Sequence, residues 1–145
     1  MPRMPEGKSA TRHRERLCIV MACEGAEEAA RVGDEVSQVN SGCLVTYRKA
    51  EDVLLNAPAG RVALMILASE DDPDAIVRIL RWMRHRWPHC PIVVIGDEGG
   101  GPLEVAARTG GASFLARPVS AEQWSALVSH VLSGPGRKVT EVELG

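Results

Sequence analysis

The stretch GGASFLARP, residues 110–118, contains the end of one predicted helix and the strand that follows it, a pattern that recurs along this chain. Two glycines end a preceding helical segment, and residues 112–116 form a short apolar run that is typical of a buried strand. Ser120 opens a helix soon afterwards, because Gln123 follows it at the spacing of a capping box. A buried strand followed by a capped helix indicates one unit of an α/β fold.

Four more units of this kind precede the stretch. Continuous apolar runs predict strands at residues 17–21, 43–47, 62–68 and 91–95, and helical spacing predicts helices at residues 24–39, 50–57, 73–87 and 102–108. Strands that alternate with amphipathic helices predict an α/β domain, with a five-stranded parallel sheet and helices on both faces. Right-handed crossovers at this length favour the flavodoxin-like strand order 2-1-3-4-5.

Length and composition fit a single globular domain. The chain has 145 residues, of which 45% are hydrophobic and 25% charged, and a domain of this size buries a core of its own. Residues 1–15 are polar and aperiodic, so we expect a flexible arm there. The folded domain is expected at residues 16–133. Residues 134–145 are expected to be a tail, or a linker into a further domain.

Charge and hydropathy argue against several classes of protein. The formal net charge is −2, so nothing global attracts nucleic acid or an anionic membrane. The longest apolar run, residues 62–68, is too short to span a bilayer, and no secretory signal is recognisable, which favours the cytoplasm. The cysteines show no C-x-x-C spacing and are expected to be thiols; they are Cys18, Cys23, Cys43 and Cys90.

Over residues 16–132 the chain resembles the response-regulator receiver (CheY-like) family. Residues 110–118 are similar to the family's Gly-Ala-x-x-Tyr/Phe-Leu-x-Lys-Pro segment, with Arg117 where the family has Lys. Residues 42–54 are similar to its second strand and the helix that follows, and residues 91–95 to its fourth strand. The resemblance implies a bacterial, cytoplasmic module of two-component signal transduction and phosphorelay that is not itself an enzyme.

The resemblance also implies a phosphorylation pocket at the carboxyl ends of the strands. Such a pocket needs a nucleophilic carboxylate after the third strand, two acids after the first strand that hold Mg²⁺, a hydroxyl after the fourth and a Lys after the fifth. In this chain those positions are occupied, in chain order, by Met21 and Ala22, by Ala68 (or Ser69 after a one-residue slip), by Gly96 and by Arg117. A slip at the first strand gives Ala22 and Cys23 instead.

These substitutions predict a degenerate receiver, or pseudo-receiver. It would have no catalytic residue, no metal site and no cofactor, because the phosphoryl acceptor and the Mg²⁺ ligands are missing. Two alternatives stay open. The acidic residues from Glu70 to Asp74, with Asp97, would rebuild a pocket that accepts a phosphoryl group, although Asp72 and Asp74 flank a helix start where acids act as caps. The chain would otherwise be a small flavodoxin-like protein that binds a nucleotide or flavin.

Two further groups of residues have simpler explanations. His85, His89 and Cys90 lie close together in sequence, but Pro88 breaks the helix between the histidines and no fourth metal ligand follows. The glycine run at residues 99–101 lacks the Lys of a phosphate-binding loop. Trp124 is expected in the core. Trp82 lies off the inward stripe of its helix, where it is expected either to be partly exposed or to pack on the helix's flank.

The predicted function is therefore a protein-interaction module that works without phosphorylation, in signalling or transcriptional control. Its partners would be other proteins or a second copy of the chain, and no membrane. By resemblance, the interaction surface comprises Arg108, Phe114, Arg117, Glu122 and Gln123. The basic stretch at residues 78–86, with Arg12, Arg14 and Arg16, is expected to be a solvated helix face rather than a nucleic-acid contact, because aromatic residues are few.

Overall fold

The computed structural model describes residues 17–38, 42–68, 72–97 and 101–133. Within them the chain alternates strictly between strands and helices. The elements are β1 (Leu17–Ala22), α2 (Ala26–Ser37), β2 (Gly42–Tyr47), α3 (Ala50–Leu55), β3 (Arg61–Leu67), α4 (Pro73–Arg86), β4 (Ile92–Gly96), α5 (Pro102–Thr109), β5 (Ser113–Ala116) and α6 (Ala121–Ser133). Each predicted strand and helix is present. The expected arm at residues 1–15 and tail at residues 134–145 lie outside the described residues.

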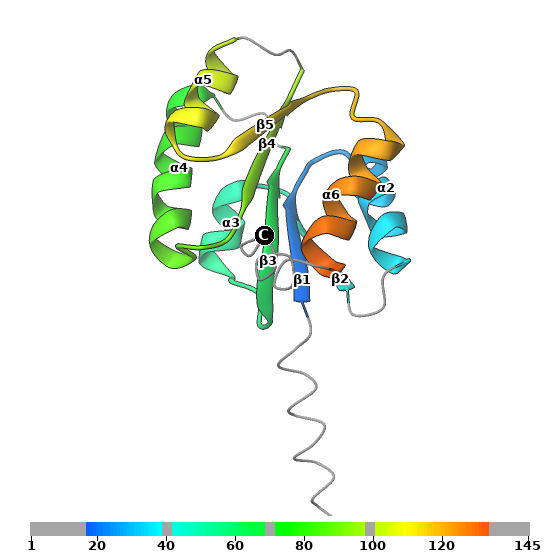
Figure 1. Ribbon diagram of the computed structural model, residues 1–145. Helices are drawn as coiled ribbons and strands as arrows, with labels where there is room; N and C mark the ends of the chain where they lie inside the picture. The colour runs from blue at the N-terminus through cyan, green and yellow to red at the C-terminus, as the bar shows by residue number, and fades with distance from the viewer. Residues whose placement is uncertain (1–16, 39–41, 69–71, 98–100, 134–145) are drawn as a thin grey trace, which may run out of the picture.

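The strands form one parallel sheet in the order β2-β1-β3-β4-β5, as predicted (Figure 1). β1 lies between the edge strand β2 and β3, and it pairs with both along its whole length. Because all strands run the same way, all their carboxyl ends meet at one edge of the sheet. That edge is where ligands bind in open α/β sheets, so the loops after β1, β3, β4 and β5 define the place to look for a site.

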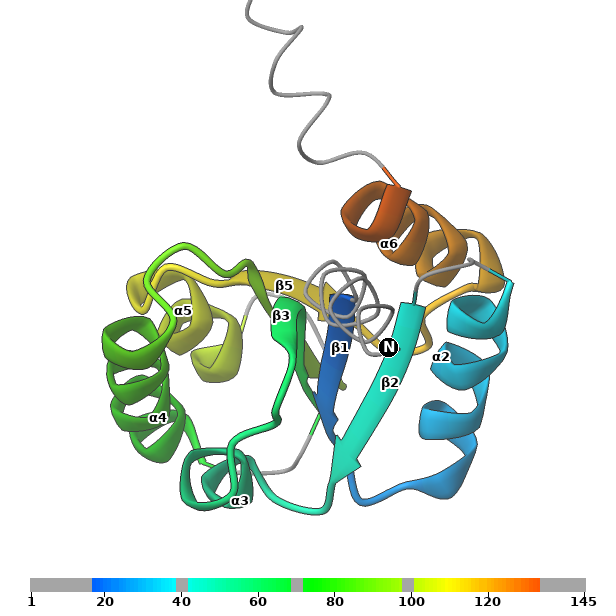
Figure 2. The same cartoon turned by 90° about the horizontal axis from the view of Figure 1, so that it is seen from below.

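Helices cover both faces of the sheet (Figure 2). Helices α3, α4 and α5 pack on one face, and α2 and α6 on the other. Alternate residues of β1 point to opposite faces, so Val20 and Ala22 join the first core and Ile19 and Met21 the second. Both cores are dominated by aliphatic side chains. Trp124 is 1% exposed and belongs to the second core, as predicted.

The helix starts follow the capping signals of the sequence. Asp72 is the N-cap of α4 and accepts a hydrogen bond from the backbone N–H of Ala75 at 2.8 Å, and Pro73 fills the first helical position. At α6 the capping box is reciprocal. The N–H of Ser120 donates to Gln123 Oε1 at 2.9 Å, and the N–H of Gln123 donates to Ser120 Oγ at 3.1 Å. These local contacts fix where α4 and α6 begin.

The bounds of two helices are narrower than the apolar spacing predicts. The helix expected at residues 24–39 runs only from Ala26 to Ser37, because Gly25 is in the extended conformation of an N-cap and Gln38 ends the hydrogen-bonded turns. The helix expected at residues 50–57 ends at Leu55. Both differences are of the size expected for helix ends that are read from periodicity alone.

Replacing Leu80 with Ala tests how much stability the α4 side of the core provides. Leu80 is fully buried, so Leu80→Ala removes its buried methyl groups and leaves a cavity, and should lower the free energy of unfolding by about 2–5 kcal/mol. Leu55→Ala is the matched control, because Leu55 is 77% exposed and its loss should change that free energy by less than about 0.5 kcal/mol. Urea unfolding measures both. Equal losses would contradict this packing.

Candidate functional site

The carboxyl ends of β1, β3, β4 and β5 bring the expected pocket positions to one edge of the sheet. Met21 and Ala22 are the last two residues of β1, and Ala68 directly follows β3. The two strand ends are tied together, because the N–H of Ala68 donates to the carbonyl of Ala22 at 2.8 Å. Gly96 is the last residue of β4. Ser69, the alternative position after β3, lies outside the described residues.

The residues at the ends of β1 and β3 are apolar and buried. Met21 and Ala22 have no exposed surface, and Ala68 is 3% exposed. The Met21 and Ala68 side chains belong to the core on the α2 and α6 face, and Ala22 belongs to the core on the other face. None of them carries an oxygen with which to ligate a cation or attack a phosphorus atom. The edge at β1 and β3 therefore provides hydrophobic packing rather than ligands.

Gly96 is closely approached by two side chains. A Cβ at this position would lie 2.7 Å from Leu103 Cδ2 and 3.0 Å from Phe114 Cζ, both closer than ordinary van der Waals contact. A Ser or Thr here would force both neighbours to move. Backbone polar groups supply the contact instead, because the N–H of Arg117 donates to the carbonyl of Gly96 at 2.7 Å. The end of β4 is thus joined to the end of β5 through the backbone.

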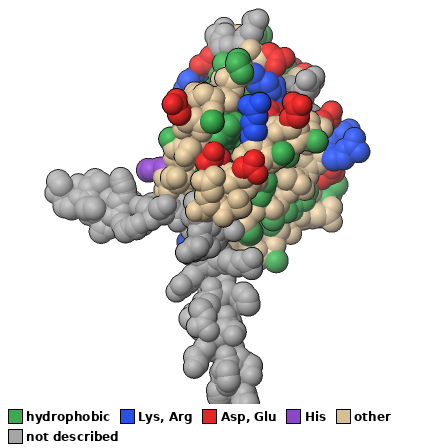
Figure 3. Space-filling view, turned by 90° about the vertical axis from the view of Figure 1, so that its right-hand side faces the viewer, with side chains coloured by type: hydrophobic (Ala, Val, Ile, Leu, Met, Phe, Trp, Pro, Cys, Tyr) green, Lys and Arg blue, Asp and Glu red, His purple; other side chains and the backbone are tan. Residues whose placement is uncertain are grey.

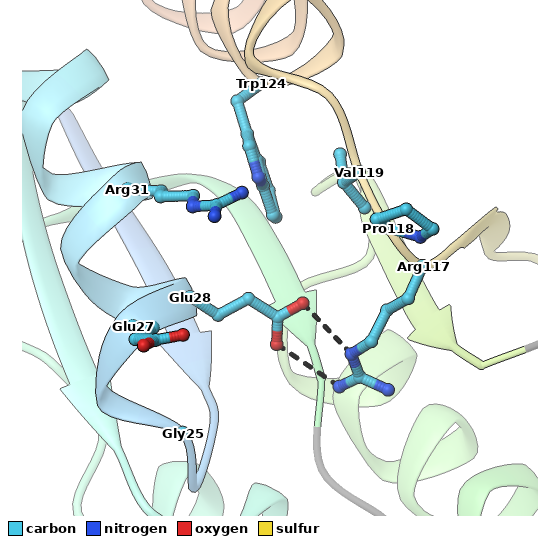
Figure 4. A pocket seen from close by; sticks show the side chains of 8 residues that line it. All are labelled: Gly25, Glu27, Glu28, Arg31, Arg117, Pro118, Val119 and Trp124. Carbon is cyan, nitrogen blue, oxygen red and sulfur yellow. Dashed lines mark hydrogen bonds and ion pairs between the residues drawn. The ribbon is translucent and has the colours of Figure 1, made fainter.

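Arg117, which directly follows β5, makes the central polar contact of this edge. Its Nε donates to Glu28 Oε2 at 3.0 Å and its Nη2 to Glu28 Oε1 at 3.2 Å, a two-bond pairing of guanidinium and carboxylate (Figure 4). Glu28 lies in the first turns of α2, 89 positions earlier in the chain. This pairing joins α2 to the residue that follows β5.

The same guanidinium reaches two further acceptors. Arg117 Nη2 donates to the carbonyl of Ala68 at 2.9 Å, and Nη1 donates to Asp97 Oδ1 at 2.9 Å. Since an arginine side chain has five N–H bonds, these contacts occupy four of them. We call Glu28, Asp97 and Arg117 the strand-end cluster. It bridges α2, the loops after β3 and β4, and the end of β5.

Partial burial distinguishes the two acidic partners of Arg117. The side chains of Arg117 and Glu28 are 26% and 20% exposed, whereas that of Asp97 is 78% exposed. The hydrogen bond with Glu28 is the largest influence on the pKa of Arg117 and raises it, with partial burial opposing and Asp97 adding to the rise. Arg117 is therefore a permanent cation, held chiefly by Glu28.

Cys23 borders the strand-end cluster. Its Sγ donates to the carbonyl of Gly25 at 3.2 Å and lies 3.6 Å from Glu28 Oε1. Burial raises the pKa of the Cys23 thiol, and the charge of Glu28 adds to the rise. The neutral thiol is thus favoured, and it can donate a hydrogen bond to the carbonyl of Gly25 or to Glu28.

An open hollow of about 300 Å³ lies beside the cluster, between α2 and the start of α6 (Figure 4). Its walls combine acidic, basic and apolar side chains; they are formed by Gly25, Glu27, Glu28, Arg31, Arg117, Pro118, Val119 and Trp124. Figure 3 shows acidic and basic side chains close to one another on this side of the molecule. Within α2 the acids outnumber the single Arg31, and α6 has one Glu and no Lys or Arg, so these two helices do not form a basic surface of the kind that a nucleic-acid backbone attracts.

The described residues contain no group of three or more His, Cys, Asp or Glu side chains placed to hold a metal ion. His85, His89 and Cys90 do not form such a group. Of the acidic residues after β3, Asp72 is engaged as the cap of α4, and Asp74 is exposed in the first turn of that helix. Glu70 and Asp71 lie outside the described residues. None of the described helices is long and apolar enough to cross a membrane.

One residue of the predicted interaction surface, Phe114, is not on the surface. Phe114 is only 9% exposed, because its side chain packs in the core beside Gly96. Arg108, Glu122 and Gln123 are exposed on α5 and α6, where Arg108 pairs with Glu104 of its own helix at 2.9 Å. Arg117 is mostly buried in the strand-end cluster rather than displayed.

The basic stretch of α4 is only partly a solvated face. Arg84 is not free there: its Nη1 donates to the carbonyl of Cys90 at 2.8 Å and its Nη2 to the carbonyl of Gly111. Arg78, Arg81 and Arg86 are exposed as expected. Trp82 is 60% exposed, which confirms its predicted position off the inward stripe.

Sequence reasoning missed the two acids of the strand-end cluster as partners of Arg117. In the sequence, Glu28 is explained equally well as an acid that complements the dipole of its own helix, and Asp97 as an acidic residue in a loop. Both acids lie at the carboxyl edge of the predicted sheet, so their position in the predicted fold could have indicated that they pair with Arg117. A cation after β5 and acids after β1 and β4 face one another once the strand order is known.

Arg117→Met tests the strand-end cluster. The variant keeps a long apolar side chain but leaves Glu28 without its cation, so the free energy of unfolding should fall by about 1–3 kcal/mol. The matched control is Arg108→Met, which breaks an exposed pair within one helix and should cost no more than about 0.5 kcal/mol. Urea unfolding of both variants gives the comparison. A loss for Arg117→Met no larger than for the control would show that the cluster contributes little.

Comparison with known proteins supports the fold. No protein-family model matches the sequence, and no curated protein matches it either. Solved structures do match. A response regulator receiver protein from Pseudoalteromonas atlantica is 18% identical with a TM-score of 0.67, covering 81% of this chain and 98% of that one. The BeF3-activated receiver domain of DrrB is 18% identical with a TM-score of 0.64, covering 80% and 96%.

A third match is a CheY-like protein, TadZ, from Pseudomonas aeruginosa, 15% identical with a TM-score of 0.65 and covering 79% of this chain and 98% of that one. At these identities the likeness is one of fold. Each alignment takes in nearly the whole of the matched domain, so the likeness is not confined to a fragment. The chain has the fold of a response-regulator receiver domain.

Proposed function

We propose that this chain is a degenerate receiver domain that accepts no phosphoryl group and acts as a protein-interaction module in signal transduction. The observation that carries the proposal is the strand-end cluster, in which Glu28 already pairs with the cation after β5. The module is regulatory rather than enzymatic, and partner binding, not phosphorylation, sets its activity.

The chemistry of phosphoryl transfer supports this proposal. A receiver needs a carboxylate nucleophile and acids that hold Mg²⁺, which neutralises the charge on the phosphoryl oxygens. Met21, Ala22 and Ala68 stand at these positions, and their side chains are buried and apolar. Gly96 stands at the position of the hydroxyl and has no side chain, and a Cβ there would displace Leu103 and Phe114. The described residues therefore offer neither the nucleophile nor the ligands that the reaction requires.

The pairing of Arg117 supports it independently. In a receiver the cation after the fifth strand binds the phosphoryl group once it arrives. Here an internal carboxylate makes the two-bond contact with the guanidinium, and Ala68 and Asp97 take two further donors. An incoming phosphoryl group would have to displace Glu28. The ion pair within the protein thus stands in for a bound anion and holds the edge in one arrangement.

The solved structures agree with a signalling role. The DrrB receiver domain is described as activated by BeF3, and the P. atlantica protein as a response regulator receiver. For this chain, the exposed residues on α5 and α6 are the proposed contact surface for a protein partner: Arg108, Glu122 and Gln123. The partner at this surface would be either another protein or a second copy of the chain.

Acetyl phosphate with Mg²⁺ tests the missing reaction. The full chain should show no added phosphoryl group by intact mass spectrometry, whereas a receiver with a complete acidic pocket, treated in parallel, should gain one. A stable adduct on a carboxylate would overturn the proposal. Its position would then be decisive, because an adduct on Glu70 or Asp71 would establish the alternative of a rebuilt acidic pocket.

Beryllofluoride provides a second readout that needs no covalent bond. A ligand that binds only the folded state raises the melting temperature. With Mg²⁺ and beryllofluoride, the melting temperature of this chain should stay unchanged, because the pocket lacks both the carboxylate and the Mg²⁺ ligands. A rise that increases with beryllofluoride concentration would contradict the proposal.

A further inference from the structure

Two cysteines lie next to each other at the opposite end of the sheet from the strand-end cluster. Cys18 is the second residue of β1 and Cys43 the second residue of β2, and they are directly paired in the parallel ladder. Their Sγ atoms are 2.6 Å apart. We propose that Cys18 and Cys43 form an oxidation site, at which a hydroperoxide converts the two thiols into a disulfide that joins β1 to β2.

The distances fit this bond. A disulfide has an S–S length of about 2.05 Å and usually spans Cα atoms about 4.4–6.8 Å apart. Neighbouring strands lie about 4.8 Å apart, so residues that are paired in the ladder have a backbone separation that a disulfide accepts. With the sulfurs already at 2.6 Å, both side chains are oriented toward each other. Bond formation needs only a small shift of the two Sγ atoms.

The backbone around the pair provides room for that shift. β2 is an edge strand, so Cys43 is held by β1 on one side only. On the other side of Cys18, the pairing of β1 with β3 changes register between Cys18 and Ile19. Such an irregularity interrupts the regular ladder and lets the local twist adjust. Both partners are therefore less constrained than two residues in the middle of a regular sheet.

The different exposure of the two cysteines indicates which of them reacts first with the peroxide. Cys43 is partly exposed, whereas Cys18 is 7% exposed. The Cys43 thiolate attacks a peroxide oxygen and the O–O bond breaks, giving a sulfenic acid on Cys43 and one water or alcohol. The Cys18 sulfur then attacks the sulfenic sulfur. The S–O bond breaks, water leaves with the Cys18 proton, and the disulfide forms. The peroxide takes up the two electrons that the thiols lose.

The remaining cysteines serve as internal controls. Cys23 donates to the carbonyl of Gly25, and Cys90 donates to the carbonyl of Pro91 at 3.4 Å, so each is engaged with backbone rather than with another sulfur. Both are buried, and burial raises the pKa of the Cys90 thiol to about 11. Cys43, at which the proposed oxidation begins, is partly exposed, so these two buried thiols should be oxidised more slowly than Cys43.

The disulfide would have a structural consequence for the proposed site. The chain between Cys18 and Cys43 contains α2, and with it Glu28 of the strand-end cluster. Closing this loop restricts the unfolded chain and ties the edge strand to the centre of the sheet. We expect the oxidised protein to unfold at a higher urea concentration than the reduced protein, and to return to the lower value after reduction.

The test oxidises the reduced full chain with a small excess of hydrogen peroxide and then blocks remaining thiols with iodoacetamide. Intact mass should show a monomer that has lost two hydrogen atoms and carries two alkyl groups, since the chain has 4 cysteines. Peptide mapping without reductant should recover the peptides of Cys18 and Cys43 joined. Cys43→Ser should abolish the cross-link, and Cys90→Ser should retain it.

Mapping of the unsubstituted chain decides the result even if Cys43→Ser fails to fold. The proposal is overturned if the four thiols remain alkylatable, if Cys43 accumulates as sulfinic acid without a cross-link, or if the disulfide joins other cysteines. A disulfide-linked dimer would overturn it as well, because the sulfurs would then have found partners in a second molecule. The phosphorylation test is unaffected by any of these outcomes.

Discussion

The contact between Arg117 and Glu28 organises the carboxyl edge of the sheet. It joins the first turns of α2 to the residue after β5, and the same guanidinium extends to the backbone after β3 and the side chain after β4. The apolar ends of β1 and β3 provide no polar groups of their own. The cation and its acids therefore supply the side-chain polar contacts between these segments, in addition to the backbone hydrogen bonds that join the strand ends.

The proposed loss of the phosphoryl acceptor would change how this receiver fold is regulated. Phosphorylation normally supplies the free energy that shifts a receiver between conformations, and a chain without an acceptor has to obtain it from a ligand with different affinities for the two states. Protein partners are the proposed source here. The strand-end cluster stays assembled without any such ligand, since both members of its main ion pair belong to the chain. At the far end of the same strands, the proposed disulfide between Cys18 and Cys43 would add a separate, redox-dependent constraint.

Most of the fold was predictable, because five apolar runs, intervening amphipathic helices and the capping residues Asp72 and Ser120 are local signals. The side-chain partners were not. Glu28 pairs with a residue 89 positions away, and its sequence neighbourhood equally fits a helix-dipole acid. Phe114 was assigned to the interaction surface by resemblance alone, and its side chain is buried, since a family likeness does not show which side chains of a strand face the core. The pairing of Cys18 with Cys43 depends on strand register, which no spacing in the sequence reveals.

A double-mutant cycle between Glu28 and Arg117 measures how strongly their contact couples α2 to the end of β5. Glu28→Gln, Arg117→Met and the double variant are compared by urea unfolding with the corresponding cycle at Glu104 and Arg108. The expected coupling free energy is about 1–3 kcal/mol for the first pair, within the range of residues that share one network, and less than about 0.5 kcal/mol for the second. Equal coupling in both cycles would contradict this expectation, because the contact across the sheet edge would then be an ordinary surface ion pair.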